Sequence, residues 1–300
     1  MEQRRTEHKE GEPRQTTIIT HRGLDPEKQN YFAESSREAF ADHIARGFGL
    51  EFDLQFTRDG HIVILHDDNL TRLTGGNDSR KIHEVDCAEL LAMDFKGCHL
   101  ASLGELIRMI QSNAQNRSVN AIHIKHAWQG HKHLKAILKR LEGADAERFV
   151  LFDLKVPAAR YLKEKNRHLH LAPSVAHEYD RERYNSVVGG TLLPLEAVIR
   201  YRSVYDWVWL DEWDRSEKRG GIKALYNTEV FASLRKEGLR IALVTPELHK
   251  TSPGLLGGEA HEDASTKTRL MERIAEILML HPDAVCTDYP DDVRRLLLST

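Results

Sequence analysis

Short apolar runs alternate with longer amphipathic stretches along most of the 300-residue chain. An apolar run that ends at polar or turn residues is typical of a buried strand, and a stretch with apolar residues on one side is typical of a helix. The predicted strands lie at residues 17–20, 50–56, 121–124, 149–153, 168–172, 207–210, 240–244 and 284–287. The predicted helices lie at about 131–141, 157–165, 228–236 and 266–280, and after the cap residues Ser35 or Ser36 and Ser102.

This alternation predicts the fold class. Strands that alternate with helices form a parallel sheet, and eight such units over this length are typical of a (β/α)8 TIM barrel. The alternative is an open doubly wound sheet, but no G-x-G-x-x-G motif follows any of the strands. No internal repeat or linker divides the sequence, so we expect one α/β domain over residues 16–300.

Three segments fall outside the alternation. Residues 1–15 are charged and lack an apolar core, which predicts a disordered leader and not a secretory signal. Asp59-Gly60 predicts a tight turn into an extra strand at 61–65. The stretch from about 67 to 101 is polar, and we expect it to be a small insertion after the second strand that lies over the strand ends.

Composition narrows the class of protein. Hydrophobic residues make up 40% of the chain, which suffices for a sizeable core, and the net charge of −3 gives no broad basic surface for nucleic acid or an anionic membrane. No apolar run approaches the roughly 20 residues that span a bilayer, so no integral membrane segment is expected. Cys87, Cys98 and Cys286 are odd in number and scattered, which favours a reducing compartment, the cytoplasm. The oligomeric state is not predicted.

Ionisable residues gather at the ends of the first strands. Glu51 and Asp53 are two residues apart on one strand, so their side chains point to the same face and suit a hard divalent cation. His21 and Arg22 follow the first strand, and His66 follows the extra strand. An unperturbed imidazole titrates near neutral pH, so two histidines can divide the work of general base and general acid.

These residue types together fit the cleavage of a phosphodiester. A metal ion and Arg22 can neutralise the non-bridging oxygens, while one histidine takes a proton from the nucleophile and the other gives one to the leaving alkoxide. Lys125, at the end of the third strand, is a second candidate for phosphate contact, and a structural ion pair is its alternative role. The expected partner is therefore a small phosphodiester substrate.

The same residues carry a family resemblance. In order and spacing, the chain resembles the glycerophosphodiester phosphodiesterase family over residues 17–75 and again near 284–291. The motifs are His21-Arg22-Gly23, Glu51-Phe52-Asp53, Thr57-Arg58-Asp59-Gly60, His66-Asp67, Leu70-Thr71-Arg72-Leu73-Thr74 and Thr287-Asp288-Tyr289-Pro290.

The resemblance implies a (β/α)8 barrel that hydrolyses glycerophosphodiesters to sn-glycerol 3-phosphate and an alcohol, an activity of lipid and glycerol metabolism. It implies Mg²⁺ or Ca²⁺ held by Glu51 and Asp53, His21 and His66 as the acid/base pair, and phosphate binding by Arg22. The insertion would cover the glycerol end of the substrate.

Two departures from the family pattern affect the expected site. The family's Pro-Glu-Asn-Thr after the first strand is replaced by 33–36, in which only Glu34 is kept as a candidate for substrate binding. The family's third metal ligand is the Glu of a Glu-x-Lys, whereas this chain has His123 two residues before Lys125. Imidazole is better suited to Mn²⁺ or Zn²⁺ than to Mg²⁺ or Ca²⁺, so His123 is either a third ligand or a hydrogen-bonding partner.

Two later strands end in unusually charged segments. Asp153 follows the fourth strand, and Glu212 and Trp213 follow the sixth. Asp153 or Glu212 would restore the missing carboxylate or bind substrate hydroxyls, and Trp213 would stack on a sugar or glycerol. Glu247, after the seventh strand, is a weaker candidate of the same kind.

These departures leave two alternatives open. The first is an enzyme that cleaves or forms a sugar phosphodiester of the agrocinopine kind, which would use the extra carboxylates and Trp213. The second is a phosphodiester-binding protein that has lost catalysis together with its third metal ligand. Retention of both histidines argues against the second, because a binding protein has no need for an acid/base pair.

Overall fold

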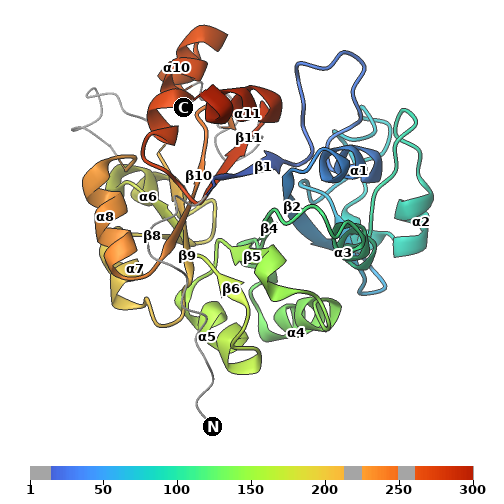
Figure 1. Ribbon diagram of the computed structural model, residues 1–300. Helices are drawn as coiled ribbons and strands as arrows, with labels where there is room; N and C mark the ends of the chain where they lie inside the picture. Colours follow the sequence, from blue (N-terminus) through green and yellow to red (C-terminus); the bar gives the residue numbers. More distant parts are fainter. Residues whose placement is uncertain (1–14, 213–224, 249–260, 300) are drawn as a thin grey trace.

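The computed structural model describes residues 15–212, 225–248 and 261–299 (Figure 1). The disordered leader predicted at 1–15 lies almost wholly outside these residues, and so does Trp213. None of the described helices is long and apolar enough to cross a membrane.

Eight parallel strand positions form the curled sheet at the centre of the molecule, as the alternation predicted (Figure 1). The strands are β1 (Thr17–His21), β2 (Gly49–Phe56), β4 (Asn120–His123), β5 (Phe149–Phe152), β6 (His170–Leu171) continued by β7 (Ser174–Ala176), β9 (Trp207–Asp211), β10 (Arg240–Val244) and β11 (Ala284–Thr287). The first strand, β1, pairs with both β2 and the last strand, β11, so the first and last strands are neighbours in the sheet. The prediction of a (β/α)8 barrel is confirmed.

The fifth strand position is split in two. β6 pairs with β5, β7 pairs with β9, and Pro173 lies between them. Proline has no backbone N–H to donate to a ladder, but its carbonyl still accepts a hydrogen bond from Trp209 N at 3.0 Å. The predicted strand at 168–172 is thus the first half of a broken strand that closes the barrel.

Two short strands lie beside the barrel strands. The extra strand expected at 61–65 is β3 (Ile62–Ile64), which pairs antiparallel with β2. β8 (Leu192–Leu193), which the pattern did not predict, pairs with β7.

The helices pack around the sheet. The predicted ones are α1 (Arg37–Ala45), α3 (Leu103–Ser112), α4 (His131–Arg140), α5 (Val156–Lys165), α8 (Thr228–Lys236) and α10 (Lys267–Leu278). Ser36 and Ser102 cap α1 and α3, because each hydroxyl accepts a hydrogen bond from the backbone N–H three residues later. Among the described residues, three further helices were not predicted: α6 (Glu178–Tyr184), α7 (Leu195–Arg200) and α11 (Pro290–Ser299).

Residues 67–101 form a polar-surfaced region between β3 and α3. It contains a 3₁₀ turn at Ile82–Glu84 and the short helix α2 (Cys87–Ala92), and it lies outside the barrel beside α1 and α3 (Figure 1). Its apolar side chains form a cluster separate from the main core, made of Val63, Leu65, Leu70, Ile82, Val85, Cys87, Leu90, Phe95 and Leu100. This cluster fixes the region against the end of β3, directly before His66.

Candidate active site

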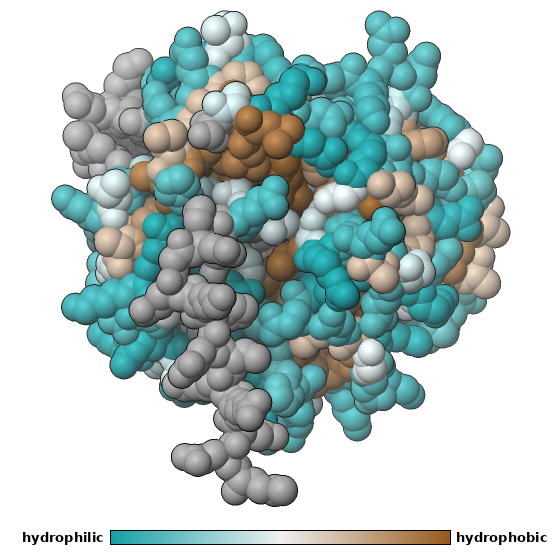
Figure 2. All heavy atoms as spheres, in the orientation of Figure 1, coloured by the Kyte–Doolittle hydropathy of each residue, from teal (hydrophilic) through white to brown (hydrophobic). Residues whose placement is uncertain are grey.

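A pocket opens where the carboxyl ends of the parallel strands meet, the rim at which barrel enzymes carry their active sites. Its lining combines ionisable and apolar side chains: His21, Arg22, Glu51, Asp53, His66, His123, Phe152, Asp153, Ser174, Val188, Leu192, Trp209, Asp211, Val244, Leu248 and Cys286. In the orientation of Figure 1, the molecular face is hollowed near its middle, with hydrophobic side chains gathered there among mostly hydrophilic ones (Figure 2).

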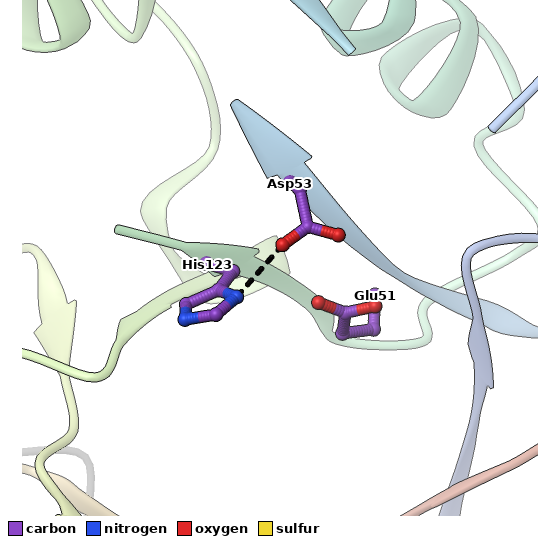
Figure 3. Close-up of side chains that lie close together, drawn as sticks. All are labelled: Glu51, Asp53 and His123. Carbon is purple, nitrogen blue, oxygen red and sulfur yellow. Dashed lines mark hydrogen bonds and ion pairs between the residues drawn. The ribbon is translucent and has the colours of Figure 1, made fainter. Parts of the chain in front are cut away.

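Three of the predicted site residues form a compact cluster. Glu51 and Asp53 project from β2, and His123 projects from β4, where it is the strand partner of Asp53 (Figure 3). One ligand atom from each side chain lies within 4.8 Å of the others. Asp53 Oδ1 and His123 Nδ1 are 2.8 Å apart and hydrogen-bonded.

The chemistry of this cluster fits a divalent cation. Glu51 Oε2 is buried and accepts no hydrogen bond from any described residue, which leaves a carboxylate oxygen available to an ion. Two adjacent ligand atoms on one ion are about 3 Å apart when each bond is near 2.1 Å, close to the spacing of Asp53 Oδ1 and His123 Nδ1. Burial and the neighbouring Asp53 raise the pKa of Glu51, as expected for two carboxylates that share a site without a cation between them.

The neighbours of Asp53 and His123 favour the charged form of each side chain. Burial acts to raise the pKa of Asp53, but Lys125, His66 and His123 outweigh it and hold that pKa well below its ordinary value. Burial likewise opposes the charged form of His123, yet Asp153 and Asp53 raise the pKa of His123 to about 9. The cluster is therefore a strongly coupled set of charges in which proton and metal ion would compete for the imidazole.

His21 is fixed by a buried carboxylate. Its Nδ1 lies 2.9 Å from Asp288 Oδ1, which follows β11. The backbone N–H of Asp288 donates to Glu247 Oε1 at 3.0 Å, and the hydroxyls of Thr245 and Thr287 donate to the same oxygen at 2.7 Å. Glu247, a weaker candidate for substrate binding, is thus part of the support beneath His21.

His66 has a carboxylate partner of its own. Its Nδ1 lies 2.7 Å from Asp67 Oδ1, and Arg72 donates to both oxygens of Asp67, at 2.7 and 3.1 Å. Burial is the main reason that the pKa of His66 falls to about 4, so the imidazole is neutral at pH 7. The hydrogen bond with His66, together with Arg72, outweighs the effect of burial and lowers the pKa of Asp67.

The two predicted phosphate-binding residues lie beside the cluster. Arg22 has a left-handed backbone (φ 52°), and its Nε lies 3.4 Å from Asp53 Oδ2. Lys125 Nζ lies 3.3 Å from Asp53 Oδ1 and also donates to the backbone carbonyl of His66. Both cations therefore contact Asp53, one at each of its carboxylate oxygens.

Of the remaining candidates for substrate binding, one lines the pocket and two do not. Asp153 lines the pocket, 3.3 Å from His123 Nε2. Glu34 does not line it but pairs with Arg72 and, at 3.9 Å, with Arg22. Glu212 is buried away from the pocket lining and accepts a hydrogen bond from Arg273 at 2.7 Å, so it has a structural partner.

Several residues in the pocket lining or in contact with it carried no predicted role. Asp67 and Asp288 belong to recognised motifs but carried no predicted role, although the Thr-Asp pair after the last strand was a usable signal. Asp211 stood out only as part of the charged end of the sixth strand, and Ser174 and most of the apolar wall belong to no recognised motif.

Solved structures share this fold. A glycerophosphoryl diester phosphodiesterase from Parabacteroides distasonis matches with a TM-score of 0.66, 19% identity and coverage of 96% of this chain and 88% of that one. An Oleispira antarctica phosphodiesterase in complex with the product sn-glycerol-3-phosphate matches with a TM-score of 0.61, 15% identity and coverage of 95% and 97%. The chain thus has the barrel of these phosphodiesterases.

Sequence comparison defines the family. The profile of the glycerophosphoryl diester phosphodiesterase family matches residues 21–292, and the chain belongs to that family. A glycerophosphodiester phosphodiesterase from Caldanaerobacter subterraneus subsp. tengcongensis is 31% identical over 104 residues, 32% of this chain and 40% of that protein. The uncharacterised protein YqiK of Bacillus subtilis is 42% identical over 60 residues, 20% of this chain and 23% of that protein. The matched segment thus spans less than half the length of either relative.

Proposed function

We propose that the protein is a metal-dependent phosphodiesterase that hydrolyses a glycerophosphodiester to glycerol 3-phosphate and an alcohol. One observation carries this proposal: a single pocket contains two histidines, each paired with its own carboxylate, next to the cluster of Glu51, Asp53 and His123. Membership of the family supports the same reaction class.

The charged side chains divide the binding of the phosphate among them. Glu51, Asp53 and His123 would hold a divalent ion, which supplies Lewis-acid polarisation of the phosphate when bound. Arg22 and Lys125 would share the remaining charge of the non-bridging oxygens. Because His123 replaces a carboxylate, we expect the site to accept Mn²⁺ or Zn²⁺ as well as Mg²⁺ or Ca²⁺.

The histidines divide the proton transfers. His66 is neutral at pH 7, because its pKa is lowered to about 4, and can take a proton from the nucleophile. His21, which Asp288 orients through Nδ1, then gives a proton to the leaving alkoxide. The nucleophile is water or a neighbouring hydroxyl of the substrate, and the second route would give a cyclic phosphate first.

Other residues of the pocket lining support a second candidate substrate. Asp153 and Asp211 bring carboxylates to it, and Trp209 brings an aromatic ring. Carboxylates bind hydroxyls and aromatic rings stack on sugar faces, so a sugar phosphodiester of the agrocinopine kind would also suit these residues.

We place the enzyme in the cytoplasm, because Cys87, Cys98 and Cys286 are all free thiols.

The test is release of phosphomonoester from a panel of glycero- and sugar-phosphodiesters with Mg²⁺, Ca²⁺, Mn²⁺ or Zn²⁺, and with EDTA. We expect EDTA to abolish turnover, and His21→Ala and His66→Ala each to lower kcat by about a hundredfold to ten-thousandfold. His83→Ala, which changes an exposed histidine on the 3₁₀ turn that is not part of the pocket lining, is the matched control. If no phosphodiester turns over with any metal, or both pocket variants retain full activity, the catalytic proposal is wrong.

A further inference from the structure

The imidazole of His123 is held on three sides. Its Nδ1 faces Asp53 Oδ1 at 2.8 Å, and its Nε2 faces Asp153 Oδ2 at 3.3 Å. The ring of Phe152 stacks on it with 4.7 Å between centroids and 19° between planes, and Trp209 stacks on the other side of Phe152 at 4.1 Å. The ring therefore has one orientation, with Nδ1 toward the carboxylate cluster and Nε2 away from it.

The backbone places Asp153 for this contact. Asp153 has a left-handed conformation (φ 64°), in which its carboxylate turns back from the end of β5 toward His123. Gln129 stabilises this turn, because its amide donates to the carbonyls of Ile124 and Asp153, at 2.8 and 2.7 Å, and accepts from Lys155 N at 3.0 Å. The same side chain thus joins the ends of the strands that carry His123 and Asp153.

We propose that Asp153 is a positioning residue that makes His123 a metal ligand and sets the metal preference of the site. A neutral imidazole carries one N–H, and a carboxylate at Nε2 retains the proton there, so the lone pair of Nδ1 faces Glu51 and Asp53. A carboxylate on the outer nitrogen also increases the basicity of a metal-binding imidazole. This inference rests on the proposed function only in assuming that the cluster holds a divalent ion.

The expected consequence is selectivity among ions. Glu51 and Asp53 supply oxygen ligands, which any of the divalent ions accepts. An oriented imidazole in the third position favours first-row transition ions such as Mn²⁺ over Ca²⁺ and Mg²⁺. The competing arrangement is a protonated His123 that bridges Asp53 and Asp153 as an ion pair in place of a metal ion.

The test measures Mn²⁺ binding directly, from the electron paramagnetic resonance signal of free Mn²⁺, with Ca²⁺ and Mg²⁺ as competitors. We expect the full-length protein to bind one Mn²⁺ in preference to either competitor. Asp153→Asn should raise the Kd for Mn²⁺ by about tenfold to a hundredfold, as loss of an outer partner does in other metal sites. Asparagine tolerates a left-handed backbone, so this variant retains the turn.

Two further variants separate the role of Asp153 from general charge. Asp211→Asn removes a different carboxylate from the same pocket, and we expect it to change the Kd far less. His123→Glu should shift the preference toward Ca²⁺ and Mg²⁺, and in that background Asp153→Asn should have little further effect, because its partner is gone. If Asp153→Asn lowers the Mn²⁺ affinity equally in the wild type and in the His123→Glu background, the positioning role is refuted.

The remaining outcomes are also decisive. Wild-type protein that binds no Mn²⁺, or binds it no better than Ca²⁺, overturns the proposal and supports the ion-pair arrangement. Selective Mn²⁺ binding that follows the expected order among the variants, in a protein without phosphodiesterase activity, would uphold this inference and refute the proposed function. If the protein hydrolyses a phosphodiester with metal but Asp153→Asn leaves the Kd for Mn²⁺ unchanged, the proposed function stands and this inference is refuted.

Discussion

At the scale of single residues, both candidate acid/base groups have the same arrangement. His21 and His66 each direct Nδ1 to a carboxylate, Asp288 at 2.9 Å and Asp67 at 2.7 Å. With Nδ1 engaged in this way, Nε2 is the nitrogen that remains for the substrate. Each histidine therefore depends on a second residue for its tautomer and its orientation.

Asp288→Asn tests this dependence. The amide of asparagine can donate to Nδ1 of His21, which would place the proton on the nitrogen that should lack it during part of the cycle. We expect kcat to fall about a hundredfold or more, with KM changed little, because proton transfer is impaired and binding is not. Steady-state kinetics on the best substrate of the panel measures both parameters.

The control for this variant is Asp291→Asn, a half-exposed carboxylate three residues further along that pairs with Arg46. It removes the same charge from the same segment without contact to His21, and kcat should stay within a factor of about two. Equal effects of the two substitutions would show that Asp288 acts through general charge or stability and not through His21.

How much of the site can be predicted differs between residues and their partners. Glu51, Asp53 and His66 could be selected because a motif and the two-residue period of a strand place them at one rim, and they do line one pocket. Their roles stay predictions. The partners could not be selected, because contact pairs such as His21 and Asp288 are 267 residues apart in sequence and meet only through barrel closure.

At the scale of elements, one side chain connects two neighbouring strand ends. Gln129 follows the 3₁₀ turn His126–Trp128 and makes three hydrogen bonds, all to backbone groups of the β4 and β5 ends. Buried backbone groups that lose their partners carry a desolvation cost. Gln129 is therefore a structural bridge between these two β/α units.

Gln129→Leu should destabilise the protein. Three backbone groups would lose their partner, so we expect the free energy of unfolding to fall by about 2–4 kcal/mol. Urea unfolding followed by circular dichroism measures the change. Gln111→Leu is the matched control, since Gln111 is likewise half-buried but makes only one long contact, of 3.5 Å, with the carbonyl of Gly143. Identical midpoints for the two variants would contradict the bridging role.

Two of the helices that were not predicted, and the broken strand, have identifiable physical causes. The helices α6 and α7 have 7 and 6 residues, too few for an apolar period to show. The strand that spans β6 and β7 is interrupted at Pro173, so its second half follows a residue that normally marks a strand end. The strands that carry the site residues were predicted, because each is long enough to show an apolar run or contains a recognised motif.

At the scale of the whole molecule, the first and last β/α units are joined by backbone and by charge. β1 pairs in parallel with β11 over four residues, from Thr17 with Ala284 to Thr20 with Thr287. Beside this seam, Arg46 at the end of α1 contacts Asp291 of α11 at 2.5 Å and Asp25, which follows β1, at 2.9 Å. Closure of the barrel thus includes a partly buried charge network.

Asp25 makes the stability of this seam depend on pH. Burial acts to raise its pKa, but the nearby His43 imidazole, 3.8 Å away, and the hydrogen bond from Arg46 outweigh burial and hold the pKa of Asp25 below its ordinary value. A carboxyl group whose pKa is lower in the folded state stabilises the fold above its unfolded pKa, about 3.9. That contribution is lost as the pH falls through the folded pKa.

Asp25→Asn should therefore cost more at neutral pH than in acid. We expect the free energy of unfolding to fall by about 1–3 kcal/mol at pH 7, because Arg46 loses the most deeply buried of its charged partners. The difference from the wild type should shrink as the pH drops below about 4, where the native carboxylate is itself being protonated. Urea unfolding at pH 7, 5 and 3 measures the trend, with Asp94→Asn, an exposed carboxylate that caps only its own turn through Gly97, as control. A difference that is constant with pH would show that Asp25 stabilises the seam by packing and not by its charge.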